Sequence, residues 1–201
     1  MYNEIYVILS AITAIAIWQW YRDVNQSIQL AHLAIVLWSG FIYLTYFVVG
    51  TDAGASISAL SSLVDTGVSP YYIDWIISTP LIIWAFCQTV GIDWVKPVFL
   101  QIGIIGTGII SDLSSEPMIW YLIGVGLMFW LFYDLFVDDT TDVMETYPIL
   151  SMIIIGTWAA YAYIWYLTAG DLQQAQFELV LVPLISKHLF AILDLEQFKN
   201  S

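Results

Sequence analysis

The segment 178–195, ELVLVPLISKHLFAILDL, decides the fold and the chemistry expected of this chain. It is an apolar run with a lysine, Lys187, in its interior. The chain has only four basic residues, and the other three, Arg22, Lys96 and Lys199, lie at or near the ends of long apolar runs. Because an ammonium group within an apolar membrane segment is costly and usually functional, Lys187 is the first candidate for a functional residue.

The composition indicates an integral membrane protein with one domain, residues 1–201. Hydrophobic residues make up 60% of the 201 residues and charged residues 10%, against roughly 25% charged residues in soluble domains. We therefore expect a multi-pass protein of the cell membrane, with the lipid bilayer as its surroundings. The net charge of −13 excludes nucleic acid as a partner, because phosphate backbones bind basic surfaces. The acidic excess suits a halophile host, where salt screens the repulsion, although lineage bias would give the same composition.

The apolar runs predict an all-α fold, a bundle of seven transmembrane helices. About 20 apolar residues cross a bilayer as a helix. The expected helices are about 3–22, 27–50, 69–90, 94–111, 116–137, 143–169 and 172–198. The connection 51–69, TDAGASISALSSLVDTGVS, is the longest, and its length allows a short surface helix.

The basic residues predict the orientation of the bundle. In a division into seven spans, Arg22, Lys96 and Lys199 all fall on one side of the membrane. By the positive-inside rule that side is cytoplasmic, so we expect an extracellular N-terminus and a cytoplasmic C-terminus. A division into six or eight spans would separate these three residues.

Lys187 and Asp74 are expected to meet inside this bundle. Lys187 is about 15 residues, or about 22 Å, into the last helix, and Asp74 lies in the outer half of the third helix. A lysine amine in an apolar pocket is suited to form an imine with an aldehyde, and a carboxylate is the counterion that a protonated imine needs. The alternative is a structural ion pair, which is uncommon because buried pairs stabilise weakly.

Aromatic residues and a glycine predict a flat slot for an extended hydrophobic aldehyde. In TWAAYAYIW (157–165), three aromatic residues at i, i+3 and i+7 share one face of the sixth helix. The candidates are Trp75 and Thr79 on the third helix, Gly108 on the fourth, and Trp158, Tyr161 and Trp165 on the sixth. An aromatic stripe alone is more often lipid-facing, so it is the combination with the amine and the acid that favours a ligand slot.

On these residues the chain resembles the microbial rhodopsins, seven-helix proteins that carry retinal on a lysine of the last helix. The resemblance is carried by DWIISTPLII (74–83), by the WxxYxxxW pattern at 158–165 and by SKHLFAILDL (186–195). It implies all-trans retinal bound to Lys187 as a protonated Schiff base, with Asp74 as counterion, and a homo-oligomer, a trimer in many relatives. The retinal-binding residues expected on this basis are Lys187, Trp75, Ser78, Thr79, Ile104, Gly108, Trp158, Tyr161, Trp165 and Pro183.

One departure from the common pattern resembles a particular branch, the xenorhodopsins. Most microbial rhodopsins have a second aspartate one turn before the lysine, and here that position is Pro183. The segments LWSGFIY (37–43) and GIISDLSSE (108–116) agree with the branch. This resemblance implies either an inward proton pump or a sensory protein.

Inward transport needs a proton acceptor on the cytoplasmic side of the imine. Asp194 follows Lys187 by seven residues, about 10 Å further inward on the same face, and His32 is expected at a similar depth. Taken alone, His32 fits a histidine bonded to a backbone carbonyl, and Asp194 fits a solvated helix end. As a pair they form a candidate acceptor. The inner position of the third helix, where an outward pump holds a carboxylic acid, is Ala85.

The route by which a proton returns from outside is expected to pass through Asp74, with Ser39 and Tyr71 or waters as carriers. The favoured function is therefore a light-driven inward proton pump, which is an ion transporter and not an enzyme, and we assign no metal site. The alternatives are a sensory photoreceptor that signals to a partner protein and a seven-helix protein without a chromophore.

Overall fold

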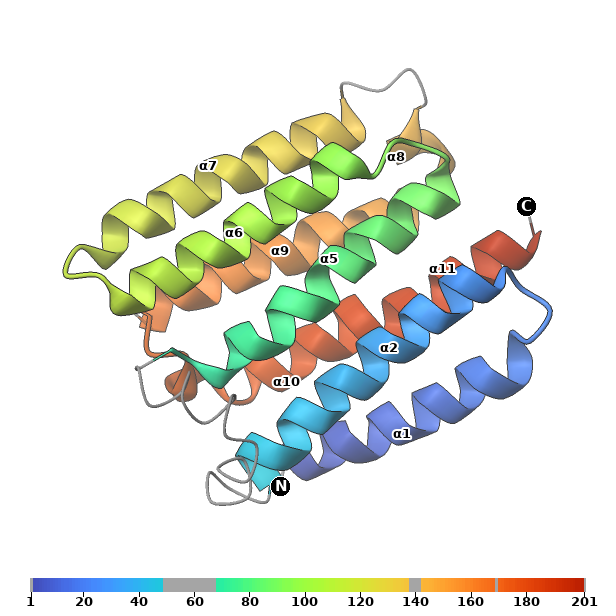
Figure 1. The fold of residues 1–201 in the computed structure, drawn as a ribbon, viewed down its shortest axis with the longest axis horizontal. Helices are drawn as coiled ribbons and strands as arrows, with labels where there is room; N and C mark the ends of the chain where they lie inside the picture. The colour runs from blue at the N-terminus through green and yellow to red at the C-terminus, as the bar shows by residue number, and fades with distance from the viewer. Residues whose placement is uncertain (1, 49–67, 138–141, 169, 201) are drawn as a thin grey trace.

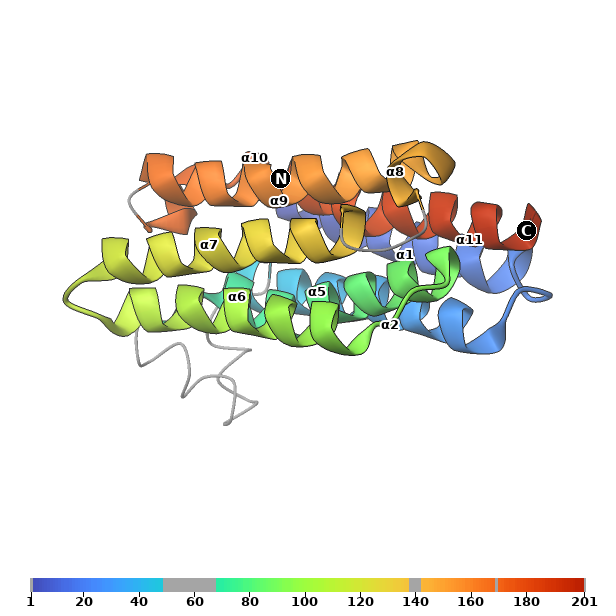
Figure 2. The same ribbon diagram turned by 90° about the horizontal axis from the view of Figure 1, so that it is seen from above.

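The computed structural model describes residues 2–48, 68–137, 142–168 and 170–200, and the regular secondary structure of these residues is entirely helical. The main helices are α1 (Tyr2–Trp20), α2 (Gln26–Ile42), α5 (Pro70–Val90), α6 (Val95–Leu113), α7 (Pro117–Phe136), α9 (Pro148–Thr168), α10 (Glu178–Pro183) and α11 (Phe190–Asn200). Figure 1 shows them as long rods that run side by side. In the turned view of Figure 2, α9, α10 and α11 lie on one side of the bundle and α2, α5 and α6 on the other.

Five of the described helices are long and apolar enough to cross a membrane. They are Gln26–Thr45, Pro70–Val90, Val95–Leu113, Pro117–Phe136 and Pro148–Thr168. The first and last described residues lie at opposite ends of the bundle (Figure 1), which fits an odd number of passes. The count of seven spans and the orientation of the termini stay predictions.

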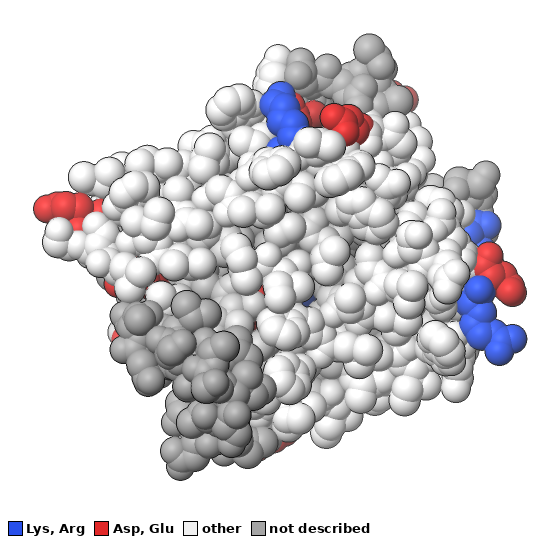
Figure 3. Space-filling view, viewed as in Figure 1, with Lys and Arg blue, Asp and Glu red and all other residues white. Residues whose placement is uncertain are grey.

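The surface of the bundle is apolar over most of its length. Large hydrophobic side chains on α7, among them Leu122, Phe129 and Trp130, are more than half exposed. In Figure 3 the charged side chains gather at the edges of the molecule, and a wide band of uncharged residues lies between them. An apolar surface of this extent would be unfavourable in water, so it indicates contact with lipid.

The helix expected at 143–169 is wrong in one respect, because the segment is broken near its start. A short turn, α8 (Val143–Thr146), comes first, and α9 begins at Pro148. The residue between them, Tyr147, has φ −126° and ψ 53°, which is not helical. A proline disfavours helical geometry in the residue before it and is well tolerated at the first position of a new helix.

The helix expected at 172–198 also differs, because the segment changes its helical type along its length. Residues Leu172–Ala175 form a 3₁₀ turn, η2, and α10 is followed by the π-helical segment η3 (Leu184–Leu189) and then by α11. Pro183 ends α10 and has no N–H to donate to the carbonyl of Leu179. The π segment that follows contains Lys187, as is common for π segments at functional sites.

The helix expected at 27–50 ends in another π-helical segment, η1 (Tyr43–Val48), and the residues after it lie outside the described part of the chain. The surface helix that the sequence allows in 51–69 falls mostly in the same undescribed stretch. The remaining expected helices agree with α1, α5, α6 and α7 to within a few residues.

Candidate functional site

Lys187 and Asp74 form an ion pair in the centre of the bundle. Both side chains are fully buried, and the Lys187 ammonium donates a hydrogen bond to Asp74 Oδ2. Ser39 completes the group, since its hydroxyl donates to Asp74 Oδ2 over 3.0 Å and accepts from Lys187 Nζ over 3.1 Å. The meeting of amine and acid expected from the sequence is therefore present.

The pair is held by three helices that the sequence places far apart: α2 carries Ser39, α5 carries Asp74 and η3 carries Lys187. Either charge alone would be strongly unfavourable at this depth, so each is stable only beside the other. An amine held in an apolar interior next to a carboxylate can lose its proton, react with an aldehyde and regain the proton with its counterion in place.

A residue that the sequence did not suggest also joins this group. The hydroxyl of Tyr6, on α1, lies 2.6 Å from Ser39 Oγ, and Tyr6 is fully buried. A tyrosine near the end of a membrane helix is usually an interfacial residue, so the sequence carried no signal for this contact. Tyr71, which was expected near Ser39, is buried with its ring centroid 6.1 Å from those of Tyr43 and Trp75.

The other expected polar pair is also in contact. His32 Nε2, from α2, lies 2.7 Å from Asp194 Oδ2, from α11, and both residues are fully buried. Asp194 is therefore not a solvated helix end, and the ring nitrogen of His32 is bonded to a carboxylate rather than to a backbone carbonyl. Phe190 occupies the same helical face between Lys187 and Asp194 by its spacing in the sequence, and its ring centroid is 6.0 Å from that of His32.

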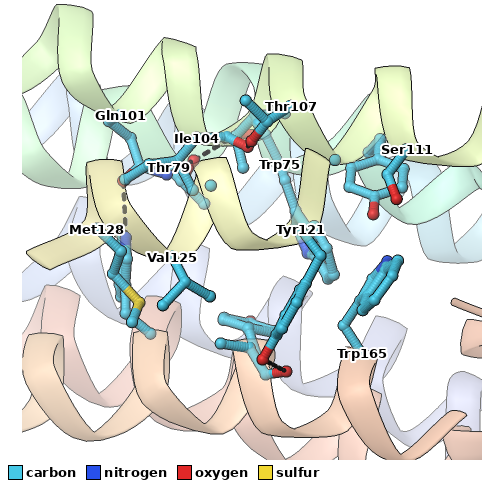
Figure 4. A pocket seen from close by; sticks show the side chains of 17 residues that line it. Trp75, Thr79, Gln101, Ile104, Thr107, Ser111, Tyr121, Val125, Met128 and Trp165 are labelled. Carbon is cyan, nitrogen blue, oxygen red and sulfur yellow. Dashed lines mark hydrogen bonds between the residues drawn. The ribbon is translucent and has the colours of Figure 1, made fainter. Parts of the chain in front are cut away.

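A cavity lies beside the ion pair, between α5, α6, α7 and α9. The space between its walls, including the open solvent at its mouth, is about 660 Å³. Its walls are mostly apolar and aromatic (Figure 4), and none of the described residues that line it is charged. The lining includes every slot residue expected from the aromatic pattern and the resemblance except three: it contains Trp75, Thr79, Ile104, Gly108, Trp158, Tyr161 and Trp165.

The three other expected residues, Lys187, Ser78 and Pro183, are not part of the cavity wall. Lys187 is joined to it through its neighbour Ser186, whose hydroxyl is 3.2 Å from the Tyr161 hydroxyl. Ser78 donates to the backbone carbonyl of Asp74 over 2.8 Å, so its hydroxyl is bonded within α5. Pro183 acts on the shape of the last helix.

The room expected at Gly108 is partly taken by another ring. A Cβ atom at Gly108 would lie 2.5 Å from Cε1 of Tyr72, so a larger residue at this position would have to displace the Tyr72 ring. Tyr121, which the sequence did not single out, closes the cavity on the side of α7. Its ring stacks on Trp165 with centroids 4.6 Å apart and planes at 8°, and its hydroxyl donates to the carbonyl of Ala162 over 3.3 Å.

Gln101, also missed by sequence analysis, ties three walls of the cavity together. Its amide nitrogen donates to Thr79 Oγ1 over 2.8 Å, and its amide oxygen accepts from Trp158 Nε1 over 2.7 Å (Figure 4). Thr79 in turn donates to the carbonyl of Trp75 over 2.8 Å. A lone amide within the apolar run of α6 was the signal that could have indicated this link.

These residues fit retinal, an apolar polyene that ends in an aldehyde. The cavity is apolar, its Trp75 and Tyr161 walls lie next to the ion pair, and the amine that could bond the aldehyde is the one lysine buried there among the described residues.

The chain is similar to known proteins in both sequence and fold. The family model for "Bacteriorhodopsin-like protein" matches residues 1–200. Bacteriorhodopsin of Halobacterium salinarum is 27% identical over 108 residues, which are 47% of this chain and 41% of that protein. Sensory rhodopsin-2 of Haloarcula vallismortis is 25% identical over 142 residues, 62% of this chain and 60% of that protein. In both matches the chain thus covers less than two thirds of the relative.

Solved structures show the same fold along the whole chain. The ground state of halorhodopsin T203V has a TM-score of 0.79 at 18% identity and covers 100% of this chain and 93% of its own. Xanthorhodopsin, described as a light-driven ion pump with dual chromophore, has a TM-score of 0.76 at 13% identity and covers 99% and 91%.

Proteins of this family are multi-pass membrane proteins that bind retinal through a Schiff base to a lysine, and they act as ion pumps or photosensors rather than as classical enzymes. With its family match over residues 1–200, its helical bundle and its buried lysine, the chain belongs to the bacteriorhodopsin-like protein family.

Proposed function

We propose that this chain is a light-driven inward proton pump of the xenorhodopsin branch, with all-trans retinal on Lys187 and Asp74 as the counterion. The observation that carries the direction is the buried contact between His32 and Asp194. It provides a proton acceptor about two helical turns beyond Lys187, at the end of the bundle opposite to the start of α1 and α5.

The residues near Lys187 have separate roles in the transfer of its proton. When bound, retinal supplies light absorption and a change of shape beside Lys187 Nζ. Asp74 and Ser39 hold the proton on Nζ in the dark through charge and hydrogen bonding. The pair of His32 and Asp194 accepts the proton after light, because an imidazole ring bonded to a carboxylate can take up a proton while the carboxylate balances its charge.

The inner half of α5 argues against outward transport. Ala85 is fully buried, and its methyl group cannot hold a proton to refill Nζ from the inside. Position 183 is a proline and not a second acid, so Asp74 is the one carboxylate in contact with Lys187 Nζ among the described residues. With a single negative charge on that side, the proton is held there less strongly, which favours its release away from Asp74.

The test is a pH trace of illuminated cells in unbuffered medium. An inward pump makes the medium more alkaline, and a protonophore abolishes the change. Acidification of the medium by the wild-type protein would reverse the proposed direction. Lys187→Ala is the matched control, since it removes the amine and should leave cells that neither absorb visible light nor change the pH.

A sensory photoreceptor is the second candidate, and the match to sensory rhodopsin-2 favours it. It predicts a retinal pigment with a light-driven cycle but no net pH change. We further propose a homotrimer within the lipid bilayer, which light scattering of the detergent-solubilised protein would test by its mass.

A further inference from the structure

Tyr6 is the residue of α1 that reaches the ion pair. Its hydroxyl is 2.6 Å from Ser39 Oγ, and its ring is fixed on two sides. It stacks on Tyr43 with centroids 4.0 Å apart, and its edge-to-face contact with His188 has centroids 5.0 Å apart. These two ring contacts therefore fix the position of the Tyr6 phenol.

The approach of α1 to α2 depends on a glycine beside Ser39. A Cβ atom at Gly40 would lie 2.7 Å from Cβ of Ser10, which is closer than real Cβ contacts. Only glycine therefore lets α1 lie near enough for the Tyr6 hydroxyl to reach Ser39.

The hydrogen bonds around Ser39 have one consistent direction. A hydroxyl has one proton and two lone pairs, and Ser39 gives its proton to Asp74 Oδ2. Its lone pairs then accept from Lys187 Nζ and from the Tyr6 hydroxyl. Tyr6 is therefore the donor, and the sequence of donors runs from Tyr6 through Ser39 to Asp74.

The outer side of Tyr6 faces the end of the bundle at which α1 begins. Asn3 lies one turn earlier on the same face of α1, and its Oδ1 is buried without a hydrogen-bond partner among the described residues. Buried acceptors of this kind are usually satisfied by water, so we infer that water reaches this face of α1 one helical turn from Tyr6.

We propose that Tyr6 is the residue that returns protons to the ion pair, donating through Ser39 from the end of the bundle where α1 begins. A proton leaves Ser39 Oγ for Asp74 Oδ2 or Lys187 Nζ, the Tyr6 proton replaces it, and a proton from solvent restores the phenol. Each transfer breaks one O–H bond and forms one O–H or N–H bond, so no oxidant or reductant is needed. The direction of this proton transfer, from solvent towards the ion pair, rests on the proposed inward function.

The experiment compares Tyr6→Phe with Tyr43→Phe in the retinal-loaded protein. Both changes keep a ring in the same stack, but the Tyr43 hydroxyl donates to the carbonyl of Leu179 instead of to Ser39. After a flash, the return of the proton to Lys187 Nζ is followed by absorbance. We expect about tenfold slower return in Tyr6→Phe, below the usual contribution of a positioned acid because water can replace the hydroxyl in part, and no change in Tyr43→Phe.

A small weak acid such as azide should restore the rate in Tyr6→Phe, which a merely structural defect would not allow. An unchanged rate in Tyr6→Phe, equal slowing in Tyr43→Phe, or absence of rescue would each overturn the inference. Ser39→Ala, which breaks the link and leaves Tyr6 in place, should show the same slow return and serves if Tyr6→Phe does not fold.

A readout without retinal comes from solid-state NMR of protein labelled at tyrosine Cζ. The Tyr6 signal should move when Ser39 becomes alanine, and a constant signal would contradict the contact. The direction of the wild-type pH trace is measured separately, so a failure of the inward function and a failure of the Tyr6 route are told apart.

Discussion

Tyr43 donates a hydrogen bond to the carbonyl of Leu179, which is the backbone oxygen that Pro183 leaves without its helical partner. In a regular helix the N–H of residue 183 would bond this oxygen, and proline has none. The Tyr43 hydroxyl thus bonds the carbonyl that lacks its donor in α10, and the π segment η3 that carries Lys187 follows directly. Pro183 thus sets the shape of the helix that leads to Lys187.

This relationship predicts a compensating pair of variants. Tyr43→Phe leaves the Leu179 oxygen buried and unbonded, so we expect a loss of about 1–3 kcal/mol in unfolding free energy. Adding Pro183→Ala restores an N–H for that oxygen and should recover part of the loss in a double-mutant cycle measured by thermal unfolding. Additive effects of the two changes would mean that the two residues do not share this oxygen.

The second prediction concerns Asp74→Asn. Removing the negative charge beside Lys187 Nζ takes away the stabilisation of the dark state, so the absorption maximum should move to longer wavelength and proton return should slow. The retinal-free protein should lose about 3–5 kcal/mol of stability, because the buried ammonium would have no charged partner. Asp112→Asn is the matched control, since that carboxylate bonds the backbone N–H of Ser69 at another place. An unchanged spectrum in Asp74→Asn would remove this residue from the counterion role.

The third prediction concerns the amide that joins the cavity walls. Gln101→Leu has a similar size but leaves the Trp158 N–H unbonded, which should cost about 1–3 kcal/mol and shift the absorption maximum. Thr79→Ser retains the hydroxyl that accepts from Gln101, so its effect should be much smaller. Thermal unfolding and absorption spectra of the two variants check this, and equal effects would contradict the link.

The sequence predicted the parts of the site that depend on rarity or spacing. Lys187 and Asp74 stand out because charges are scarce in apolar runs, and Asp194 lies two turns from Lys187 on the same helical face. Trp158, Tyr161 and Trp165 follow from the helical period of α9. Tyr6 and Gln101 could not be found in this way, since their contacts depend on how closely helices approach, as at Gly40.

The departures from the expected continuous helices are of two kinds, a break at a proline and a change to π-helical geometry. Pro148 is visible in the sequence and could have indicated the start of α9. The π segments that begin at Tyr43 and Leu184 depend on which side chains donate hydrogen bonds to the backbone carbonyls left without helical partners. These contacts form only in the packed bundle, so hydrophobic periodicity does not predict them.

The fourth prediction tests the acceptor pair of the proposed pump. Asp194→Asn leaves an amide of nearly the same shape beside His32, so the protein should fold and form its pigment. Loss of the proton from Lys187 Nζ should slow by about 100-fold, the lower end of the contribution of a positioned base. Glu196→Gln, two residues further along α11, is the matched control and should leave this step unchanged. His32→Gln should slow the same step, and combining it with Asp194→Asn should add little, because two residues that act as one acceptor are not additive. Flash photolysis measures all four variants, and a normal rate in Asp194→Asn would mean that the proton leaves by another route.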